Sequence, residues 1–173
     1  RVSIITDENG EIRDAEIYNI GEHLSGVHIK YFSAFYQILA KRKAIRKLLK
    51  HKIKPDIIHA HYATDYGFLA AVSGFHPFVL TVHGSDILVD CAKHKLTKSF
   101  VTYALKKADV VTAPSDYMSN IIKNIVHVNP IIIQYGVDTT VFKRNDSPPD
   151  QNRENAVISA RALTNKYDIQ TII

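Results

Sequence analysis

Short apolar segments alternate with longer amphipathic ones along this 173-residue chain, and this alternation restricts the fold more than any other feature. Strands that alternate with helical patterns are typical of βαβ units, because parallel strands need long crossover connections. We expect strands at 2–6, 27–32, 56–60, 78–82, 109–113, 130–134 and 156–159, and a short extra strand at 17–20. We expect helices at 35–51, 66–73, 93–107, 116–125 and 165–173. The pattern predicts an α/β fold in which helices flank a parallel sheet.

The composition favours a globular protein of the cytoplasm. Hydrophobic residues make up 46% and charged residues 23% of the chain, as in ordinary globular domains. The only cysteine, Cys91, cannot form an internal disulfide, which fits a reducing compartment. No apolar run is long enough for a transmembrane helix. Because Arg1 lies in a strand-like run and the last residues lie in a helical pattern, we interpret the chain as a fragment of a longer protein.

A polar segment rich in proline and asparagine, 143–152, interrupts the alternation. Such a segment is typical of a linker or a long surface loop. A new strand pattern begins just after it. We therefore predict a first domain at 1–142, a linker at 143–155 and the start of a second domain at 156–173.

A strongly basic helical pattern lies between Gln37 and Pro55, where there is no acidic residue. Its cations are Lys41, Arg42, Lys43, Arg46, Lys47, Lys50, Lys52 and Lys54. A basic amphipathic helix can lie on an anionic membrane surface, so the region 41–54 is a candidate membrane contact. The alternative is a solvated outer face whose lysine stems cover apolar surface. Nucleic acid is disfavoured, since no aromatic residues are interleaved for base stacking.

The turn His83-Gly84-Ser85-Asp86 follows the apolar strand 78–82 directly. Open α/β sheets bind ligands at the carboxyl ends of their strands, so this turn is expected to face a ligand. His83 is suited to donating a hydrogen bond to a sugar hydroxyl or to stabilising developing charge; the alternative is a histidine tied to a backbone carbonyl. Gly84 allows a tight turn. Asp86 is equally suited to capping the segment that follows.

Two further groups of residues could carry chemistry. His59 and His61 alternate at a strand end and so share one face, but no third ligand stands at a matching spacing, which disfavours a metal site. Arg161 and Lys166 follow the strand 156–159 and suit a diphosphate, since a guanidinium makes forked contacts to phosphate and lysine adds a mobile charge. The alternative for this pair is two exposed charges around a helix start.

Five segments resemble, in order and rough spacing, retaining glycosyltransferases of family four, which have the GT-B fold. Four of them resemble the amino-terminal half of that family: Pro55-Asp-Ile-Ile-His-Ala-His61, Val79-Leu-Thr-Val-His-Gly-Ser-Asp86, Ala108-Asp-Val-Val-Thr-Ala-Pro-Ser115 and Gly136-Val-Asp-Thr-Thr-Val-Phe142. The fifth, from Ser159 to Ile169, resembles the opening of the nucleotide-binding carboxyl-terminal domain. Each segment is degenerate alone, but five in order are specific.

The resemblance implies two Rossmann-like domains that face a cleft, with the donor nucleotide sugar mainly on the second and the acceptor mainly on the first. It implies a catalytic role for His83 beside the transferred sugar, and donor diphosphate contacts for Arg161 and Lys166. The cleft residues that it implies are His61, Gly84, Ser85, Asp86, Ser115 and Gly136. Transfer would retain the anomeric configuration without a required metal ion or other cofactor, since the nucleotide sugar is a substrate.

Three departures from the family pattern bear on these expectations. The family's first strand and glycine-rich loop would precede Arg1, and its Glu-x₇-Glu motif would follow Ile173. Tyr135 stands where the family usually has asparagine before Gly-Val-Asp. We therefore expect the fragment alone to be inactive.

The leading hypothesis is a cytoplasmic glycosyltransferase of polysaccharide or glycoconjugate synthesis, at the inner membrane face if the acceptor is lipid-linked. A GT-B sugar-nucleotide epimerase is an alternative; it needs a carboxylate base, for which the first-domain loops offer only Asp65 and Asp86. A noncatalytic sugar- or nucleotide-binding module is a second alternative, which Arg161 and Lys166 disfavour. A dehydrogenase is disfavoured because the chain has no Gly-x-Gly-x-x-Gly fingerprint.

Overall fold

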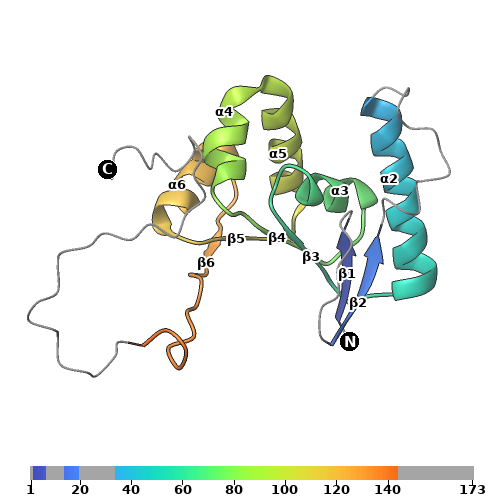
Figure 1. Ribbon diagram of the computed structural model, residues 1–173. Helices are drawn as coiled ribbons and strands as arrows, with labels where there is room; N and C mark the ends of the chain where they lie inside the picture. The colour runs from blue at the N-terminus through green and yellow to red at the C-terminus, as the bar shows by residue number, and fades with distance from the viewer. Residues whose placement is uncertain (1, 7–13, 20–33, 144–173) are drawn as a thin grey trace, which may run out of the picture. The chain divides into compact units, whose positions relative to one another are not determined.

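The computed structural model describes residues 2–6, 14–19 and 34–143 (Figure 1). The chain divides into two units, Arg1–Tyr135 and a second that begins at Gly136. The predicted strands 27–32 and 156–159, the helix 165–173 and nearly all of the predicted linker lie outside the described residues. Arg161 and Lys166 lie outside them as well, and the domain boundaries stay predictions.

A four-stranded parallel sheet forms the centre of the first unit, in the order β3-β4-β5-β6. Its strands are β3 (Ile58–His61), β4 (Phe78–Thr81), β5 (Val110–Ala113) and β6 (Ile131–Ile132). The helices α3 (Tyr66–Ser73), α5 (Lys95–Lys107) and α6 (Asp116–Ile125) lie in the crossover connections. The predicted α/β fold, with a parallel sheet flanked by helices, is confirmed.

A separate parallel pair consists of β1 (Val2–Thr6) and β2 (Ala15–Asn19). The first strand agrees with the prediction, and the short extra strand expected at 17–20 is observed as β2. Strand β3 begins two residues later than predicted from 56–60. The reason is its pairing: the Ile58 amide donates to the Pro77 carbonyl at 3.0 Å, so the ladder starts where β4 is about to begin.

Helix boundaries agree best where capping signals are clear. Helices α3 and α6 have the predicted bounds, and the Ser115 hydroxyl caps α6 by accepting from the Met118 amide at 3.3 Å. The basic helix α2 (Ala34–Leu48) continues into a π-helical turn, η2 (Leu49–Ile53). Ahead of α5, the structure adds two short helical segments that the prediction lacked, η3 (Asp86–Asp90) and α4 (Cys91–Lys93).

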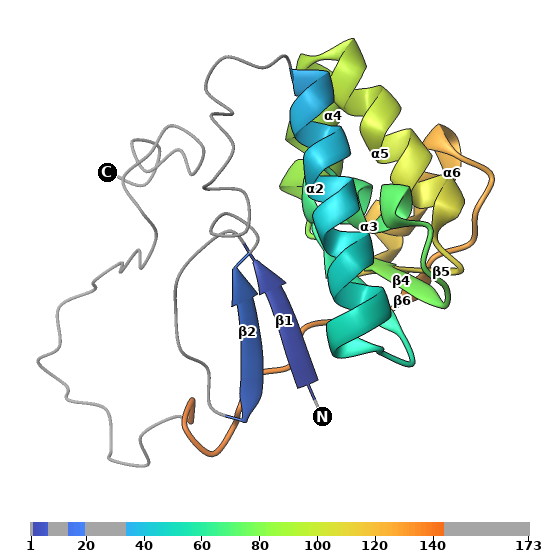
Figure 2. The same cartoon turned by 90° about the vertical axis from the view of Figure 1, so that its right-hand side faces the viewer.

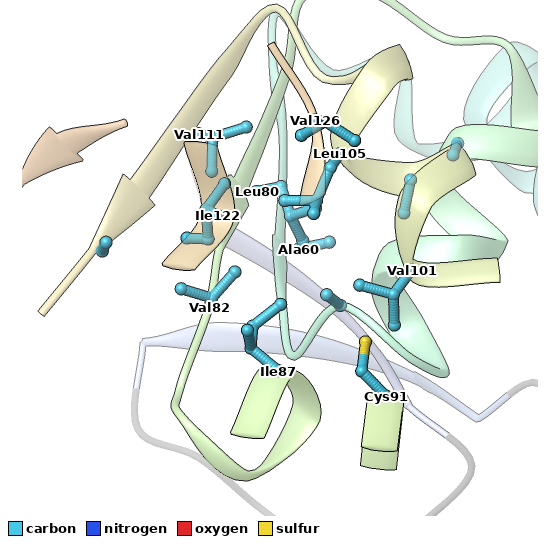
Figure 3. Close-up of a cluster of buried hydrophobic side chains, with 14 of the residues drawn as sticks. Ala60, Leu80, Val82, Ile87, Cys91, Val101, Leu105, Val111, Ile122 and Val126 are labelled. Carbon is cyan, nitrogen blue, oxygen red and sulfur yellow. The ribbon is translucent and has the colours of Figure 1, made fainter. Parts of the chain in front are cut away.

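The main core forms around β4 (Figure 3). Phe78, Leu80 and Val82 alternate along the strand and its extension, and all three are almost completely buried. Val101 and Leu105 of α5, together with Ile122 of α6, belong to the same cluster. Burying a side chain of this size contributes about 1.5–3 kcal/mol. The turn after β4 therefore extends from a strand whose apolar side chains are buried in the core.

Helix α3 lies between α2 and α5 and packs against both (Figure 1 and Figure 2). The Arg42 Nε donates to the Val72 carbonyl at 2.7 Å and ties α2 to α3. At Gly67 a β-carbon would lie 2.8 Å from Leu80 Cδ1 and 2.9 Å from the Tyr62 carbonyl oxygen. Glycine at this position lets the start of α3 approach β4 closely.

Within the described ranges, no helix combines the length and the apolar character needed to cross a membrane.

In the second unit, the Asp138 carboxylate accepts from the Thr140 amide at 2.9 Å and from the Thr140 hydroxyl at 2.6 Å, which closes a turn.

Candidate functional site

The carboxyl ends of β3, β4 and β5 carry a group of polar side chains. The parallel register pairs His61 with Thr81 and Thr81 with Thr112, so these strand ends lie next to one another. His83 follows two residues beyond Thr81. Ligands of open α/β sheets bind at this edge, and we define the candidate site by the side chains gathered here.

Three imidazoles lie together at this edge. The rings of His59 and His61 have centroids 4.2 Å apart, which confirms that the two side chains share a face. The Nδ1 atom of His61 lies 3.1 Å from the Nε2 atom of His83, within hydrogen-bond distance, and these two rings meet edge to face. The structure therefore brings the histidines of β3 next to the histidine of the turn after β4, although α3 separates these segments in the sequence.

Two threonines extend this group across the sheet. The His59 Nε2 lies 2.7 Å from the Thr81 hydroxyl, and the Thr81 hydroxyl lies 2.6 Å from that of Thr112. Hydrogen bonds thus connect the ends of β3, β4 and β5. The sequence analysis missed both threonines, although their positions at the ends of consecutive predicted strands were a usable signal.

Two of the three histidines at this edge, His59 and His61, have lowered pKa values. Burial lowers the pKa of His59, and the nearby His83 ring lowers it further. Burial also lowers the pKa of His61, with additional contributions from His59 and His83. Among the described residues, no carboxylate contacts any of the three rings. Neutral imidazoles can both donate and accept hydrogen bonds, which suits contacts to hydroxyl groups.

Asp86 holds the backbone around the site in place through hydrogen bonds. Its side chain is fully buried and accepts hydrogen bonds from four backbone amides. The Ala63 and Gly84 amides lie at 2.8 Å, the Ile87 amide at 3.1 Å and the His83 amide at 3.2 Å. The carboxylate thereby joins the turn after β4 to the loop after β3. Asp86 is the first residue of η3 and not its cap, so the observed role differs from the expected capping of the following segment, and the side chain does not reach solvent as a base would.

Gly84 gives the turn after β4 its shape. Its φ of +118° lies in a region that residues with a side chain rarely adopt, which confirms the expected tight turn. Its carbonyl accepts from the Ile87 amide at 3.1 Å and the Leu88 amide at 2.7 Å, so the helical segment η3 starts directly from it.

Tyr62 is a site residue that the sequence analysis did not identify. Its backbone is left-handed, with φ +75°, and its ring centroid lies 6.3 Å from that of His83. Its hydroxyl donates to Asp90 at 2.8 Å; since it has one proton, the Ser85 hydroxyl, also at 2.8 Å, donates to it. Burial, as the main cause, raises the pKa of Tyr62. Ser85 is therefore held by a side chain from the loop after β3.

Tyr135 is a second tyrosine whose ring lies near His83. The two ring centroids are 5.7 Å apart, and the Tyr135 hydroxyl donates a long hydrogen bond of 3.5 Å to the Val82 carbonyl. The residue that departs from the family pattern thus contacts the principal candidate residue. The sequence marked its identity as unusual but gave no indication of this contact.

A polar hollow of about 400 Å³ adjoins Tyr62. Its lining consists of Tyr62, Thr64, Asp65, Asp90, His94 and Thr97. Carboxylates and hydroxyls are the groups that bind the hydroxyls of saccharides, because each can accept from a sugar O–H. Tyr62 thus lies between this hollow and His83.

Of the predicted site residues, the structure gathers His61, His83, Gly84 and Ser85 at one edge, with Asp86 beneath them. Ser115 uses its side-chain oxygen as the cap of α6. Gly136 belongs to the second unit. In the part of the chain that the structure describes, no cluster of three or more His, Cys, Asp or Glu side chains could hold a metal ion.

Comparison with known proteins gives two kinds of match. A family model described as glycosyl transferase 4-like matches residues 1–115. TuaC of Bacillus subtilis (strain 168), provisionally named a teichuronic acid biosynthesis glycosyltransferase, is 31% identical over 115 residues, covering 64% of this chain and 30% of TuaC. MJ1178 of Methanocaldococcus jannaschii, an uncharacterized glycosyltransferase, is 26% identical over 139 residues, covering 78% of this chain and 37% of its own length. The chain spans about a third of these relatives.

Proposed function

The chain belongs to the glycosyl transferase 4-like family, and on that premise we propose that the full-length protein is a retaining glycosyltransferase. It transfers a sugar from a nucleotide-sugar donor to a glycan or lipid-linked acceptor, in polysaccharide or glycoconjugate biosynthesis. The name of TuaC supports the polysaccharide part of this proposal. The observation that carries the proposal is the joined pair of His61 and His83 at the carboxyl edge of the parallel sheet.

His83 is the catalytic residue of this proposal. The turn after β4 is held by the buried Asp86 and by Gly84, so the imidazole extends from a fixed backbone. An imidazole there can contact a hydroxyl of the transferred sugar and stabilise charge that develops at its anomeric carbon. Arg161 and Lys166 neutralise the leaving diphosphate, which needs no metal ion.

The acceptor binds on the side of Tyr62. The polar hollow beside Tyr62 offers Asp65 and Asp90 as acceptors for saccharide hydroxyls. Two carboxylates disfavour a phosphate group at this point, because like charges repel. In this proposal the donor diphosphate binds to the cations Arg161 and Lys166, whereas the acceptor saccharide binds beside the carboxylates Asp65 and Asp90.

The test uses the protein expressed from its full-length gene. Calorimetric titration with UDP, GDP and ADP sugars identifies the donor, and release of the nucleotide diphosphate measures transfer. We expect His83→Ala to lower kcat about 10²–10³-fold, the typical cost of one preorganised transition-state contact. Arg161→Ala and Lys166→Ala should each weaken donor binding about tenfold or more, about 1.4 kcal/mol.

The control is His127→Ala, at an exposed histidine between α6 and β6, which should leave turnover unchanged. Absence of binding to any donor by a folded protein would contradict the proposal. Selective binding without transfer to any acceptor would instead support the noncatalytic module.

We also propose that the basic helix contacts an anionic membrane surface. Arg42, Lys43, Arg46, Lys47 and Lys50 are exposed on α2 and its extension, around the partly exposed Leu39. Ile45, Leu48 and Leu49 are buried on the other side. Lys52 differs from the exposed cations, since its ammonium lies over the Tyr18 ring at 4.6 Å from the centroid. The exposed cations can each contribute about 1 kcal/mol near anionic lipid.

Vesicle sedimentation tests this contact. The full-length protein should bind phosphatidylglycerol vesicles more tightly than phosphatidylcholine vesicles, and added salt should weaken the binding. Reversing Lys43 and Lys50 to glutamate should weaken it at least about tenfold. The matched control reverses Lys106 and Lys107, two exposed cations at the end of α5. Equal losses in both variants would mean that binding depends on net charge alone, and the proposed contact through α2 would be wrong.

A further inference from the structure

The orientation of the His83 ring depends on one side-chain hydrogen bond. Among the described residues, the only side chain in hydrogen-bond contact with this ring is His61, whose Nδ1 lies 3.1 Å from Nε2 of His83. The rings of Tyr62 and Tyr135 lie beside it, at centroid distances of 6.3 and 5.7 Å, without a hydrogen bond to it. An exposed imidazole loses rotamer freedom when it is held in place, and here the holding contact is to His61.

The same contact links the tautomers of the two rings. A single proton lies between Nδ1 of His61 and Nε2 of His83, so one of these nitrogens donates and the other accepts. A neutral imidazole carries one proton, so the choice at Nε2 fixes whether Nδ1 of His83 is an N–H or a bare nitrogen. His61 thereby selects what the other nitrogen of His83 offers to a ligand.

His61 is itself well placed to hold a partner. It is the last residue of β3, and the next amide, that of Tyr62, donates to the Thr81 carbonyl at 2.9 Å. The ring of His59 lies against it at a centroid distance of 4.2 Å, and His59 is in turn bound to the Thr81 hydroxyl. The strand pairing and the neighbouring ring therefore preorganise His61.

We propose that His61 is a positioning residue that fixes the ring orientation and the tautomer of His83. This role rests on the proposed function, in which His83 lies beside the transferred sugar. The new role concerns His61, which need not contact the substrate itself. The preorganised contact acts in the transition state, so its loss reduces kcat more than it weakens donor binding.

Substitutions can test the role atom by atom. His61 uses Nδ1, a position that the side-chain amide of asparagine can occupy, whereas glutamine places its amide farther out, near Nε2. In the full-length protein we expect His61→Asn to keep kcat within about threefold, and His61→Gln and His61→Leu to lower it about tenfold, the usual size of one net hydrogen bond. The donor KM should stay within about twofold in all three variants. His127→Leu serves as the control.

Nitrogen-15 NMR of the imidazoles gives a readout that does not depend on turnover. The wild-type protein should show one predominant tautomer for His83, His61→Asn should keep a single tautomer, and His61→Leu should show a mixture. A kcat and a tautomer for His83 that are both unchanged in His61→Leu would overturn the proposal. If the wild-type protein transfers no sugar, the proposed function fails while the NMR result still decides the positioning role.

Discussion

Histidines lie at both ends of the central sheet, and the two ends use them differently. At the amino end, His76 Nδ1 lies 2.6 Å from the Asp109 carboxylate, which also accepts from the Phe78 amide at 2.7 Å. At the carboxyl end, His61 pairs with His83 instead of an acid. The amino-end contact joins the starts of β4 and β5, as a structural clamp does. The side chains of both contacts are exposed to solvent, so the two ends differ in the partner of the histidine and not in its burial.

The pKa values differ in the same way. The hydrogen bond from His76, followed by that from the Phe78 amide, lowers the pKa of Asp109 below its ordinary value of 3.8. Burial and neighbouring rings lower the pKa of His59 and His61 below 6.5. Lowering the pH therefore protonates His59 and His61 at the carboxyl end and Asp109 at the amino end in separate pH ranges. The acid partner ties His76 to the start of β5, whereas His61 at the carboxyl end is paired with another imidazole.

The largest expected effect is the loss of the carboxylate that supports the carboxyl end. Asp86→Ala would leave four backbone amides without their acceptor in a buried position. We expect the free energy of unfolding, measured by urea denaturation, to fall by about 3–5 kcal/mol. The matched control is Asp65→Ala, an exposed residue that makes no side-chain cap, with an expected change within about 0.5 kcal/mol. Equal stabilities for the two variants would contradict the supporting role of Asp86.

The second largest effect is expected from a substitution in the turn after β4. Gly84→Ala places a side chain on a backbone with φ +118°, where the surrounding space is open and only the conformation opposes it. A cost of about 1–3 kcal/mol in unfolding free energy is expected. Gly136→Ala is the control, since that glycine has open space and no positive φ. A Gly84→Ala variant as stable as wild type would show that the turn relaxes freely.

A smaller effect is expected in the pH dependence of stability, through the histidines at the carboxyl end of the sheet. Because the pKa of His59 and of His61 is lowered on folding, their stabilising contribution is complete above 6.5 and is lost as the pH falls below it. The double variant His59→Gln and His61→Asn should therefore lose less stability than wild type between about pH 7.5 and pH 5. Thermal unfolding at several pH values measures this difference. Parallel curves would mean that these rings do not titrate differently in the folded state.

The smallest effect is expected at the amino end. The pKa of Asp109 is lowered on folding, so its contribution is present above 3.8 and disappears as the pH falls through the folded-state value. Asp109→Asn should unfold at a lower temperature than wild type near neutral pH, and the two should converge at strongly acidic pH. Turnover should be unaffected, in contrast to His83→Ala. A loss of turnover without a loss of stability would remove the distinction between the two ends.

Prediction from sequence succeeded where local signals suffice. The bounds of α3 and α6 agreed, Ser115 capped its helix, and Gly84 had the expected backbone. It failed where a distant partner decides the outcome. Strand β3 began late because its first amide pairs with Pro77, and Tyr62 was missed because its partners Ser85 and Asp90 belong to another loop.

The sequence by itself determined the alternation of strands and helices, the tight turn after β4 and the shared face of His59 and His61, since each depends on neighbouring residues. Only the tertiary structure decided that His61 meets His83, 22 residues away, and that Thr81 meets Thr112, 31 residues away. The physical reason is the parallel order and register of β3, β4 and β5. Pairing between whole strands brings their carboxyl ends to one edge, and no local pattern of residues specifies which strands will be neighbours.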